Sequence, residues 1–353
     1  MVVGLLATPI MIQNGQSLVN LVAAQQALLV ERLSCLLAPL HPVLRADVTR
    51  ALQGEGKLLY QAPASAESSQ PPPLAGMWAL ATFLIAHYVA PDIDPIFAGN
   101  VAIAVECFVC ATDLLDDVTD GDQTTTLLAL GPARALNVST ALLVLAHQAI
   151  LSTPQQGIDP RLILRLLDTF EEAALAAVSG QHRDILSEQQ SIRACTREEC
   201  LDIAAAKAGS IMRLTFRLGG ICAGADDALC QQLSESGEML GIAHQLDNDA
   251  HDLYHLLQAH NNSALSTESV KSDLERGKKT LPIVLAARDD QTLQRFSELT
   301  DEEKKEHLQA FQEAIMTTWG ICLLYRERVR ERFQALEARK PVTLALRMLL
   351  GLA

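Results

Sequence analysis

The feature that most constrains the fold is an apolar run, Val101 to Cys110, which leads directly into a dense acidic stretch at residues 113–122. Glu106 is the one charged residue inside the run, so the pattern predicts a buried helix. The aspartates arrive at the C-terminal end of this helix, where negative charge opposes the helix macrodipole. A solvated helix end has no local electrostatic reason to carry so many carboxylates, and the stretch therefore indicates a ligand site.

The spacing of the aspartates supports a metal ligand set. Positions i, i+3 and i+4 share one face of a helix, so Asp116 and Asp120 point the same way, as do Asp113, Asp117 and Asp120. Carboxylates on one face repel one another unless a cation neutralises them. Oxygen ligands suit Mg²⁺, which retains water and commonly bridges to the phosphates of a substrate.

Composition limits the class of protein. Leu and Ala are abundant among 49% hydrophobic residues and aromatics are only 4%, which favours an all-α bundle. The net charge of −14 argues against nucleic acid and anionic membrane surfaces as partners. Because no uninterrupted apolar run approaches roughly 18 residues, no transmembrane segment is predicted. The eight cysteines are scattered in apolar surroundings and are typical of reduced core residues in a cytoplasmic protein.

Helical periodicity, proline and capping residues give the order of elements. We expect a composition-defined flexible loop at 62–73, a turn at 127–132 and a capping box formed by Thr196 and Glu199. The expected helices cover residues 16–39, 42–60, 74–87, 133–151, 160–187, 197–223 and 226–252, with a helical pair at 302–338.

A second acidic stretch, residues 245–252, ends the predicted helix 226–252. It offers Gln245, Asn248, Asp249 and Asp252 as oxygen ligands. The two acidic helix ends can face each other across a cavity that holds Mg²⁺ ions on a diphosphate. Three cations can complete such a clamp: Lys207, Lys271 and Lys278. A zinc site at the nearby histidines is disfavoured because no cysteine pair accompanies them.

These motifs resemble those of the trans-isoprenyl diphosphate synthase, or polyprenyl synthetase, family. The order and spacing of the elements match that family from about residue 74 to 290, with Glu106 ten residues before the first motif. The matching elements are Asp116-Asp117-Val118-Thr119-Asp120, Gly180-Gln181…Asp184, Lys207-Ala208-Gly209, Gly241…Gln245…Asn248-Asp249…Asp252 and Ser272-Asp273-Leu274…Gly277-Lys278-Lys279-Thr280-Leu281-Pro282.

The resemblance implies a class I isoprenoid synthase fold, a single domain over 1–353 with roughly 10–13 helices around a central cavity. It would divide into N-terminal helices at 1–60, the loop at 62–73, a catalytic core at 74–290 and C-terminal helices at 291–353. A homodimer is implied as well.

The resemblance also implies roles for residues. About two or three Mg²⁺ ions would bind an allylic prenyl diphosphate and take up charge on its leaving oxygens. Metal ligands would be Asp116, Asp117, Asp120, Asn248, Asp249 and Asp252, supported by Gln245. The diphosphate would be held by Gln181, Lys207, Lys271 and Lys278. Positions 111 and 112 would line the tail pocket. Because they are the small residues Ala111 and Thr112, a substrate of C15 or longer is expected to fit.

The sequence departs from chain-elongating members where they grip isopentenyl diphosphate. No Lys or Arg occurs between Lys57 and Arg134, the stretch at 70–73 is Gln-Pro-Pro-Pro, and Thr124-Thr125-Thr126 replaces the family's basic residues after the first motif. A second diphosphate is costly to hold without cations, so this site is predicted to be atypical or lost.

Several activities therefore stay open. The first is a prenyltransferase acting on a peptide or small-molecule acceptor, since the motifs are similar to those of bacterial enzymes that prenylate a pheromone tryptophan. A terpene synthase, a non-catalytic regulatory subunit and ordinary chain elongation are the alternatives.

Overall fold

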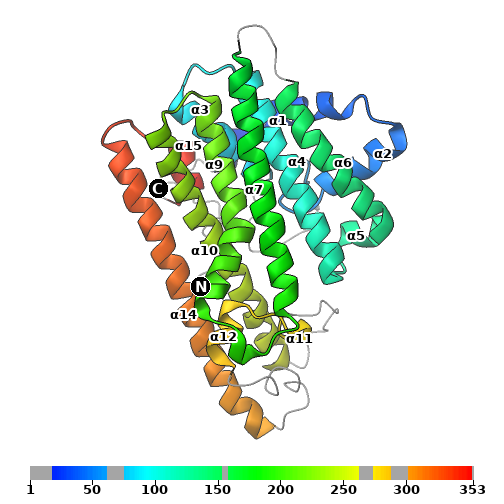
Figure 1. Cartoon of the computed structure of the whole chain (residues 1–353), viewed down its shortest axis with the longest axis vertical. Coiled ribbons are helices and arrows are strands. Elements are labelled where there is room, and N and C mark those ends of the chain that lie inside the picture. Colours follow the sequence, from blue (N-terminus) through cyan, green and yellow to red (C-terminus); the bar gives the residue numbers. More distant parts are fainter. Residues whose placement is uncertain (1–17, 62–74, 153–157, 262–272, 288–300, 352–353) are drawn as a thin grey trace. The chain divides into compact units, whose positions relative to one another are not determined.

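The computed structural model describes residues 18–61, 75–152, 158–261, 273–287 and 301–351. Every regular element in these ranges is helical (Figure 1), which confirms the all-α prediction. The predicted loop at 62–73 lies outside the described residues. The chain separates into two compact units: unit 1 is Met1–Glu171, Leu214–Ser234 and Arg330–Ala353, and unit 2 is Glu172–Arg213 and Glu235–Val329. The expectation of one domain with its four segments stays a prediction.

Unit 1 is built around one long helix, α4 (Pro95–Asp120), which packs against α1, α3 and α6 (Figure 1). Nearly all of α4 up to Ala111 is buried, so the apolar run forms the core of this unit. Phe108 on α4 meets Phe170 edge to face, with the ring centroids 5.0 Å apart. The other helices wholly within unit 1 are α1 (Leu18–Leu37), α2 (Pro42–Leu52), α3 (Met77–Val89), α5 (Thr125–Leu130), α6 (Pro132–Leu151) and α15 (Leu344–Leu349).

Capping residues fix both ends of α4. The Asp94 side chain accepts the Ile96 N–H at 2.9 Å and Pro95 occupies the first helical position, where its missing N–H costs nothing. Gly121 ends the helix in the left-handed region at φ 68°, which a glycine adopts without steric cost. The acidic stretch is therefore held at a defined helix end.

Two helices in the described ranges are long and apolar enough to cross a membrane by length and composition. One is α4, of which 83% of the most apolar window is buried in the fold. The other is α6, with 44% of its window buried. Helix α4 lies in the core, which accounts for its high hydropathy. Helix α6, by contrast, leaves an apolar face exposed.

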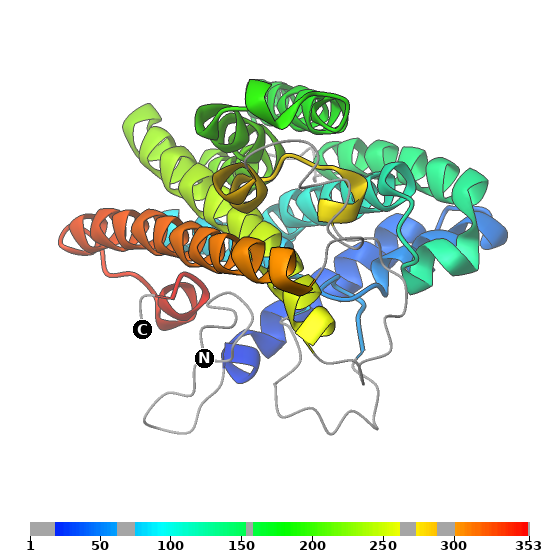
Figure 2. The ribbon, with the colours of Figure 1, turned by 90° about the horizontal axis from the view of Figure 1, so that it is seen from below.

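Unit 2 is organised by α10 (Asp227–Asn261) and α14 (Asp301–Glu337), which lie side by side in Figure 2. Leu253 and Leu257 of α10 share a core cluster with Phe311 and Ile315 of α14. The shorter elements of this unit are η1 (Ile192–Ala194), α8 (Arg197–Ala204), η2 (Ala205–Gly209), α11 (Asp273–Arg276) and α12 (Leu281–Ala286). Two further helices, α7 (Pro160–Ser187) and α9 (Ser210–Cys222), have residues in both units, as do α10 and α14.

Four predicted boundaries are wrong. Helix α2 ends at Leu52, because a turn with Gly54 and Gly56 follows, and the predicted turn at 127–132 is mostly the short helix α5. The predicted pair at 302–338 is the single helix α14. Helix α10 continues past residue 252 to Asn261, because its apolar face continues, so the second acidic stretch lies within a helix.

Glycines permit the close helix crossings inside each unit. A Cβ at Gly219 would lie 2.6 Å from the carbonyl oxygen of Thr82, so α9 approaches α3 more closely than an alanine allows. In unit 2, Gly241 of α10 would bring a Cβ to 2.2 Å from the Ala208 carbonyl oxygen. These contacts involve backbone atoms, which cannot move aside as a side-chain end can.

We predict that Gly219→Ala lowers the free energy of unfolding by about 1–3 kcal/mol, the usual cost of overpacking. Gly320 on α14 is the matched control, since a Cβ there meets nothing within 4 Å. Gly320→Ala should be neutral or stabilise by up to about 1 kcal/mol, because alanine favours a helix. Urea titrations followed by circular dichroism measure both changes. If the two variants are equally stable, the close crossing of α9 and α3 at Gly219 is contradicted.

Candidate active site

The first acidic stretch occupies the last two turns of α4. Asp113 is exposed, and Asp116, Asp117 and Asp120 are partly buried. The Asp122 N–H donates to the Asp117 carbonyl at 2.9 Å, which closes the helix end after Gly121. The aspartates are thus presented from a fixed backbone, as a preorganised metal site requires.

The threonine run after this stretch has a clear structural use. Thr124 caps α5, because its hydroxyl oxygen accepts the Leu127 N–H at 3.3 Å. The same hydroxyl donates to Asp117 Oδ2 at 2.8 Å. Burial raises the pKa of Asp117, the Thr124 hydrogen bond opposes that rise, and the charge of Asp113 adds to it. Thr124 therefore orients one of the predicted metal ligands.

Lys57 lies beside the first acidic stretch, although the sequence places it 56 residues before Asp113. Its ammonium group forms an ion pair with Asp113, and its side chain is 13% exposed. Buried Glu106 holds the neighbouring backbone, accepting the Leu58 N–H at 2.7 Å. The one charged residue of the apolar run thus fastens the turn at 54–60 to α4, and this turn delivers Lys57.

Burial shifts the pKa values of Glu106 and Lys57 in opposite directions. Burial raises the pKa of Glu106, while the charge of Lys57 and the backbone hydrogen bond from Leu58 oppose that rise. Burial alone would lower the pKa of Lys57, but the charge and hydrogen bond of Asp113, together with the charges of Cys110 and Glu106, outweigh burial and raise the pKa. Lys57 therefore stays charged in its nearly enclosed position.

The side chains of the second acidic stretch point in two directions from the middle of α10. Gln245 Nε2 donates to Asp249 Oδ1 at 2.9 Å, and Asp249 is buried. Asp247 points elsewhere and pairs with Arg326 of α14 at 3.0 Å. Asn248 is exposed. The apolar residues of α10 between these positions, such as Leu246, pack into a core cluster and fix both orientations.

Two predicted diphosphate ligands converge on one carboxylate oxygen in unit 2. Lys207 Nζ lies 2.7 Å from Asp184 Oδ2, and Lys278 Nζ lies 3.8 Å from the same atom. All three side chains are at most 12% exposed. Two ammonium groups can therefore share a single anionic oxygen at this position.

Asp273 joins this cluster to the second acidic stretch. Lys278 Nζ lies 3.7 Å from Asp273 Oδ1, and the Asp273 N–H donates to Asp252 Oδ2 at 2.9 Å. Burial raises the pKa of Asp249 to about 7, although Gln245 and the two lysines oppose the rise. Burial and the charge of Asp249 raise the pKa of Asp273 to about 8. Among the described residues of this cluster, the carboxylates thus outnumber the lysines, and a further cation would stabilise their charged forms.

Lys207 sits on a π-helical turn, η2, which follows α8 without a break. Such turns are frequent at functional sites. Gly180 of α7 lies against this turn, since a Cβ there would be 2.7 Å from the Lys207 nitrogen. The observed capping box of Thr196 and Glu199 confirms the predicted start of α8. The turn is therefore held from its preceding helix and from α7.

The donor chemistry fits Mg²⁺. The described residues contain no group of three or more His, Cys, Asp or Glu side chains already arranged as a metal site. Mg²⁺ does not require one, because it commonly takes one or two carboxylates and completes its shell with water and substrate phosphates. The first acidic stretch offers carboxylate oxygens, and the second offers carboxylate oxygens together with the amide oxygens of Gln245 and Asn248.

The remaining predicted residues occupy varied surroundings. Ala111 is fully buried, and the Thr112 hydroxyl donates to the carbonyl groups of Val109 and Phe108 in its own helix. Gln181 is partly buried on α7, one turn before Asp184. Lys271 lies outside the described residues. Sequence reasoning quoted Asp184 and Asp273 within motifs but assigned them no role, and it missed the position of Lys57.

We predict that, without divalent cations, stability decreases as the pH rises from 3.8, the ordinary pKa of Asp249, to its folded value of about 7. The folded protein binds this proton more tightly than the unfolded chain, so ionisation disfavours folding across that window. Asp249→Asn should flatten this part of the pH–stability profile, while Asp168→Asn, at an exposed position, should not. Chemical denaturation at a series of pH values measures the slope. If wild type and Asp249→Asn show the same slope of unfolding free energy against pH, the burial of the Asp249 carboxyl group is contradicted.

Comparisons with known proteins agree with this arrangement. Residues 79–317 match the family model described as polyprenyl synthetase. A (2E,6E)-farnesyl diphosphate synthase from Mycobacterium tuberculosis is 31% identical over 201 residues, covering 55% of this chain and 52% of that protein. Tryptophan prenyltransferase ComQ from Bacillus spizizenii is 28% identical over 203 residues, covering 55% of this chain and 61% of that protein. The chain thus spans about half to three-fifths of the length of these curated relatives.

The fold is similar to solved structures over almost the whole chain. The polyprenyl synthase from Caulobacter crescentus, crystallised with calcium and isoprenyl diphosphate, has a TM-score of 0.71 at 21% identity and covers 95% of both chains. This likeness confirms the isoprenoid synthase fold. Because the family model matches more than half of its residues, the chain belongs to the polyprenyl synthetase family.

Proposed function

We propose that the protein is a Mg²⁺-dependent prenyltransferase that ionises an allylic prenyl diphosphate and transfers the prenyl group to an acceptor. The approach of Lys207 and Lys278 to one oxygen of Asp184 carries this proposal, because two buried cations there already face one anionic oxygen. A diphosphate oxygen has the charge and hydrogen-bonding capacity to take that position. Both named relatives are enzymes of prenyl chemistry by their descriptions.

The residues of the chain would divide the work of ionisation. Lys207 and Lys278, with Gln181 nearby, would bind the diphosphate and neutralise the charge that develops as the carbon–oxygen bond breaks. Metal ions would be held by Asp116, Asp117 and Asp120, oriented through Thr124, and by Asp249, Asp252 and Asn248, with Gln245 as support. Bound Mg²⁺ would supply Lewis-acid stabilisation of the leaving diphosphate. Lys271 is proposed as a further diphosphate ligand from its motif alone.

The acceptor is the less determined part of the reaction. Thr124, Thr125 and Thr126 contribute no positive charge after the first motif, while Lys57 supplies one ammonium group beside Asp113. This supports an atypical isopentenyl diphosphate site with fewer cations than a second diphosphate would need. A peptide or small-molecule acceptor carries no such charge, and the relative ComQ is described as a tryptophan prenyltransferase.

A homodimer is proposed from the exposed face of α6. This face bears Leu136, Thr140, Val144, Gln148 and Leu151 without a charged residue among them, and three of the five are large and apolar. Contiguous exposed apolar surface marks an interaction site more often than a solvated face. Sedimentation of wild type and Val144→Glu tests this, and monomeric wild type would overturn it.

A cytoplasmic location is proposed from the cysteines. All eight are free, and six of them are buried. A chain that folds in an oxidising compartment more often pairs its cysteines. Fractionation of the source cells would test the location, and recovery of the protein outside the cytoplasm would contradict it.

The deciding experiment incubates the protein with Mg²⁺ and C10, C15 or C20 allylic diphosphates, with and without isopentenyl diphosphate or a Trp-containing peptide. We expect release of diphosphate that requires an acceptor and that stops with EDTA. Asp116→Ala and Asp249→Ala should each lose about a hundredfold or more in rate while remaining folded, since each removes a ligand of the leaving-group site. Hydrocarbon or alcohol products would indicate a terpene synthase, and no release in any mixture would favour a regulatory subunit.

We predict that the allylic substrate can be C15 or longer and that Ala111→Phe shifts preference to shorter chains. The residue is fully buried on α4, so a phenyl ring there must occupy neighbouring space. Ratios of kcat/KM for C10 and C20 substrates should shift by about tenfold, the value of a few buried methylene groups. Thr112→Phe is a second variant in case Ala111→Phe is unstable, and Ala228→Phe at an exposed position is the control. Unchanged ratios in both variants would contradict the tail pocket.

A further inference from the structure

The loop that carries Lys278 turns two neighbouring lysines in different directions. It joins α11 to α12, and Gly277 adopts φ 78° within it, a conformation that other residues rarely take. The Lys278 N–H donates to the Asp273 carbonyl at 2.9 Å, and the Lys278 side chain reaches Asp184 and Asp273. Lys279 is equally buried, at 6% exposure, but its contacts lie elsewhere.

The Lys279 side chain binds backbone carbonyl groups. Its ammonium group donates to the carbonyl of Gly277 in its own loop and to that of Glu188 at 3.4 Å. Glu188 directly follows the last residue of α7, where unpaired carbonyl groups and the helix dipole favour a cation. The side chain thus connects the loop to the C-terminal end of α7, the helix that carries Asp184.

The backbone of Lys279 is held from a second side. Buried Cys200 of α8 donates its thiol hydrogen to the Lys279 carbonyl, with the sulfur 3.1 Å from the oxygen. Helix α8 leads directly into the turn that bears Lys207. One residue therefore links the loop to the elements that position both Asp184 and Lys207.

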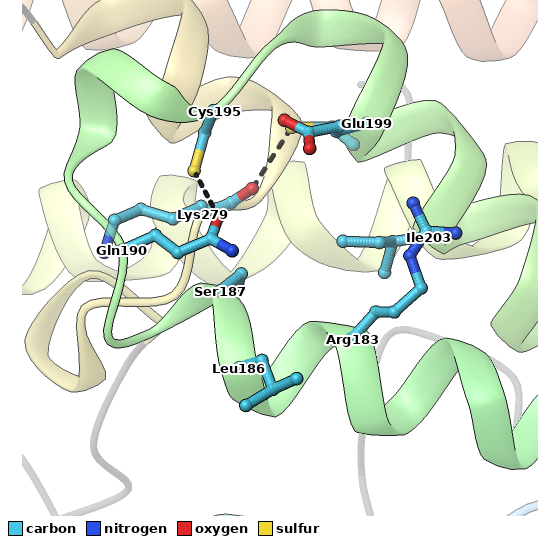
Figure 3. A pocket seen from close by; sticks show the side chains of 9 residues that line it. Arg183, Leu186, Ser187, Gln190, Cys195, Glu199, Ile203 and Lys279 are labelled. Carbon is cyan, nitrogen blue, oxygen red and sulfur yellow. Dashed lines mark hydrogen bonds between the residues drawn. The ribbon is translucent and has the colours of Figure 1, made fainter.

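A small cavity borders this connection. It has a volume of about 90 Å³, and its lining includes Lys279, Ser187, Gln190 and Cys200. Figure 3 shows the Lys279 side chain extending toward Gln190, at the other end of the cavity from Arg183. The open space leaves room for a longer cation at position 279, whereas an apolar side chain there would leave the Glu188 carbonyl without this donor.

We propose that Lys279 is a positioning residue, which fixes the loop at 276–280 so that Lys278 reaches the oxygen of Asp184 that Lys207 also binds. The Gly277 and Lys278 N–H groups donate to the Leu274 and Asp273 carbonyl groups and close the end of α11, so the contacts of Lys279 act on the part of the loop that follows this turn. This inference rests on the proposed diphosphate site. It assigns Lys279 an action through Lys278 and no contact with the substrate.

The test measures binding of inorganic diphosphate with Mg²⁺ by calorimetry, which requires no turnover. Lys279→Met should weaken binding about tenfold, because Lys278 loses its fixed position in a charge-assisted contact. Lys279→Arg should restore most of the affinity, because it keeps the cation and the cavity has room for it. Lys278→Met should weaken binding at least as much, and adding Lys279→Met to it should change the affinity less than about twofold, since residues that act through one contact are not additive.

A second readout follows the loop itself. Without the ammonium contacts of Lys279 the loop should move away from Cys200, so iodoacetamide should label the Cys200 peptide about tenfold faster in Lys279→Met, as local opening exposes a buried group. Arg193→Met, at an exposed position in the same unit, should change neither labelling nor diphosphate affinity. If Lys279→Met does not fold by circular dichroism, Cys200→Ala removes the other connection and should weaken diphosphate binding by about threefold, the value of one weak hydrogen bond.

The outcomes separate this inference from the function on which it rests. Wild type that binds no diphosphate with Mg²⁺ would overturn the proposed function. Wild type that binds diphosphate while Lys279→Met binds equally well would overturn the positioning role alone. Additive losses in the double variant would also overturn it, because Lys279 would then act independently of Lys278.

Discussion

The lysine cluster of unit 2 depends on the carboxylate of Asp184, which lies between two ammonium groups in a nearly enclosed setting. Two buried lysines would repel each other without a shared anion, and Asp184 supplies it at 2.7 and 3.8 Å. Three elements meet there: α7, the π-helical turn and the loop after α11. A ligand that binds these lysines must replace an interaction already present, so the site favours ligands more highly charged than one carboxylate.

The first acidic stretch is supported in a different way. Thr124 and Lys57 each contact one of its aspartates, and buried Glu106 fastens the turn that delivers Lys57. A polar residue inside an apolar helix is costly unless it is hydrogen-bonded. Glu106 accepts a hydrogen bond from the Leu58 N–H, so this buried side chain holds the turn that carries Lys57. Core and site are therefore linked through one side chain.

Much of this was predictable from the sequence, and the exceptions have physical causes. The composition and the resemblance of the motifs predicted the all-α fold, the apolar run predicted the buried helix α4, and the capping box predicted the start of α8. Lys57 was missed because its contact with Asp113 joins segments 56 residues apart, and no periodic pattern reports such a contact. Leu253 and Leu257 continue the apolar face of α10, whereas the cluster of acidic residues before them is a pattern typical of a helix end. The orientation of Lys279 required the folded loop.

The π-helical turn at Ala205–Gly209 has a consequence for the length of the chain at this point. It contains one residue more than an α-helical turn would, and Lys207 stands within it. Loss of a single residue there would restore regular α-helical winding with little rotation of the flanking helices, because the wider turn takes up the extra residue. The change would fall on the turn itself, where Gly180 lies against the Lys207 nitrogen and Gly241 against the Ala208 carbonyl. A deletion would therefore displace Lys207, while the helices on either side would keep their directions.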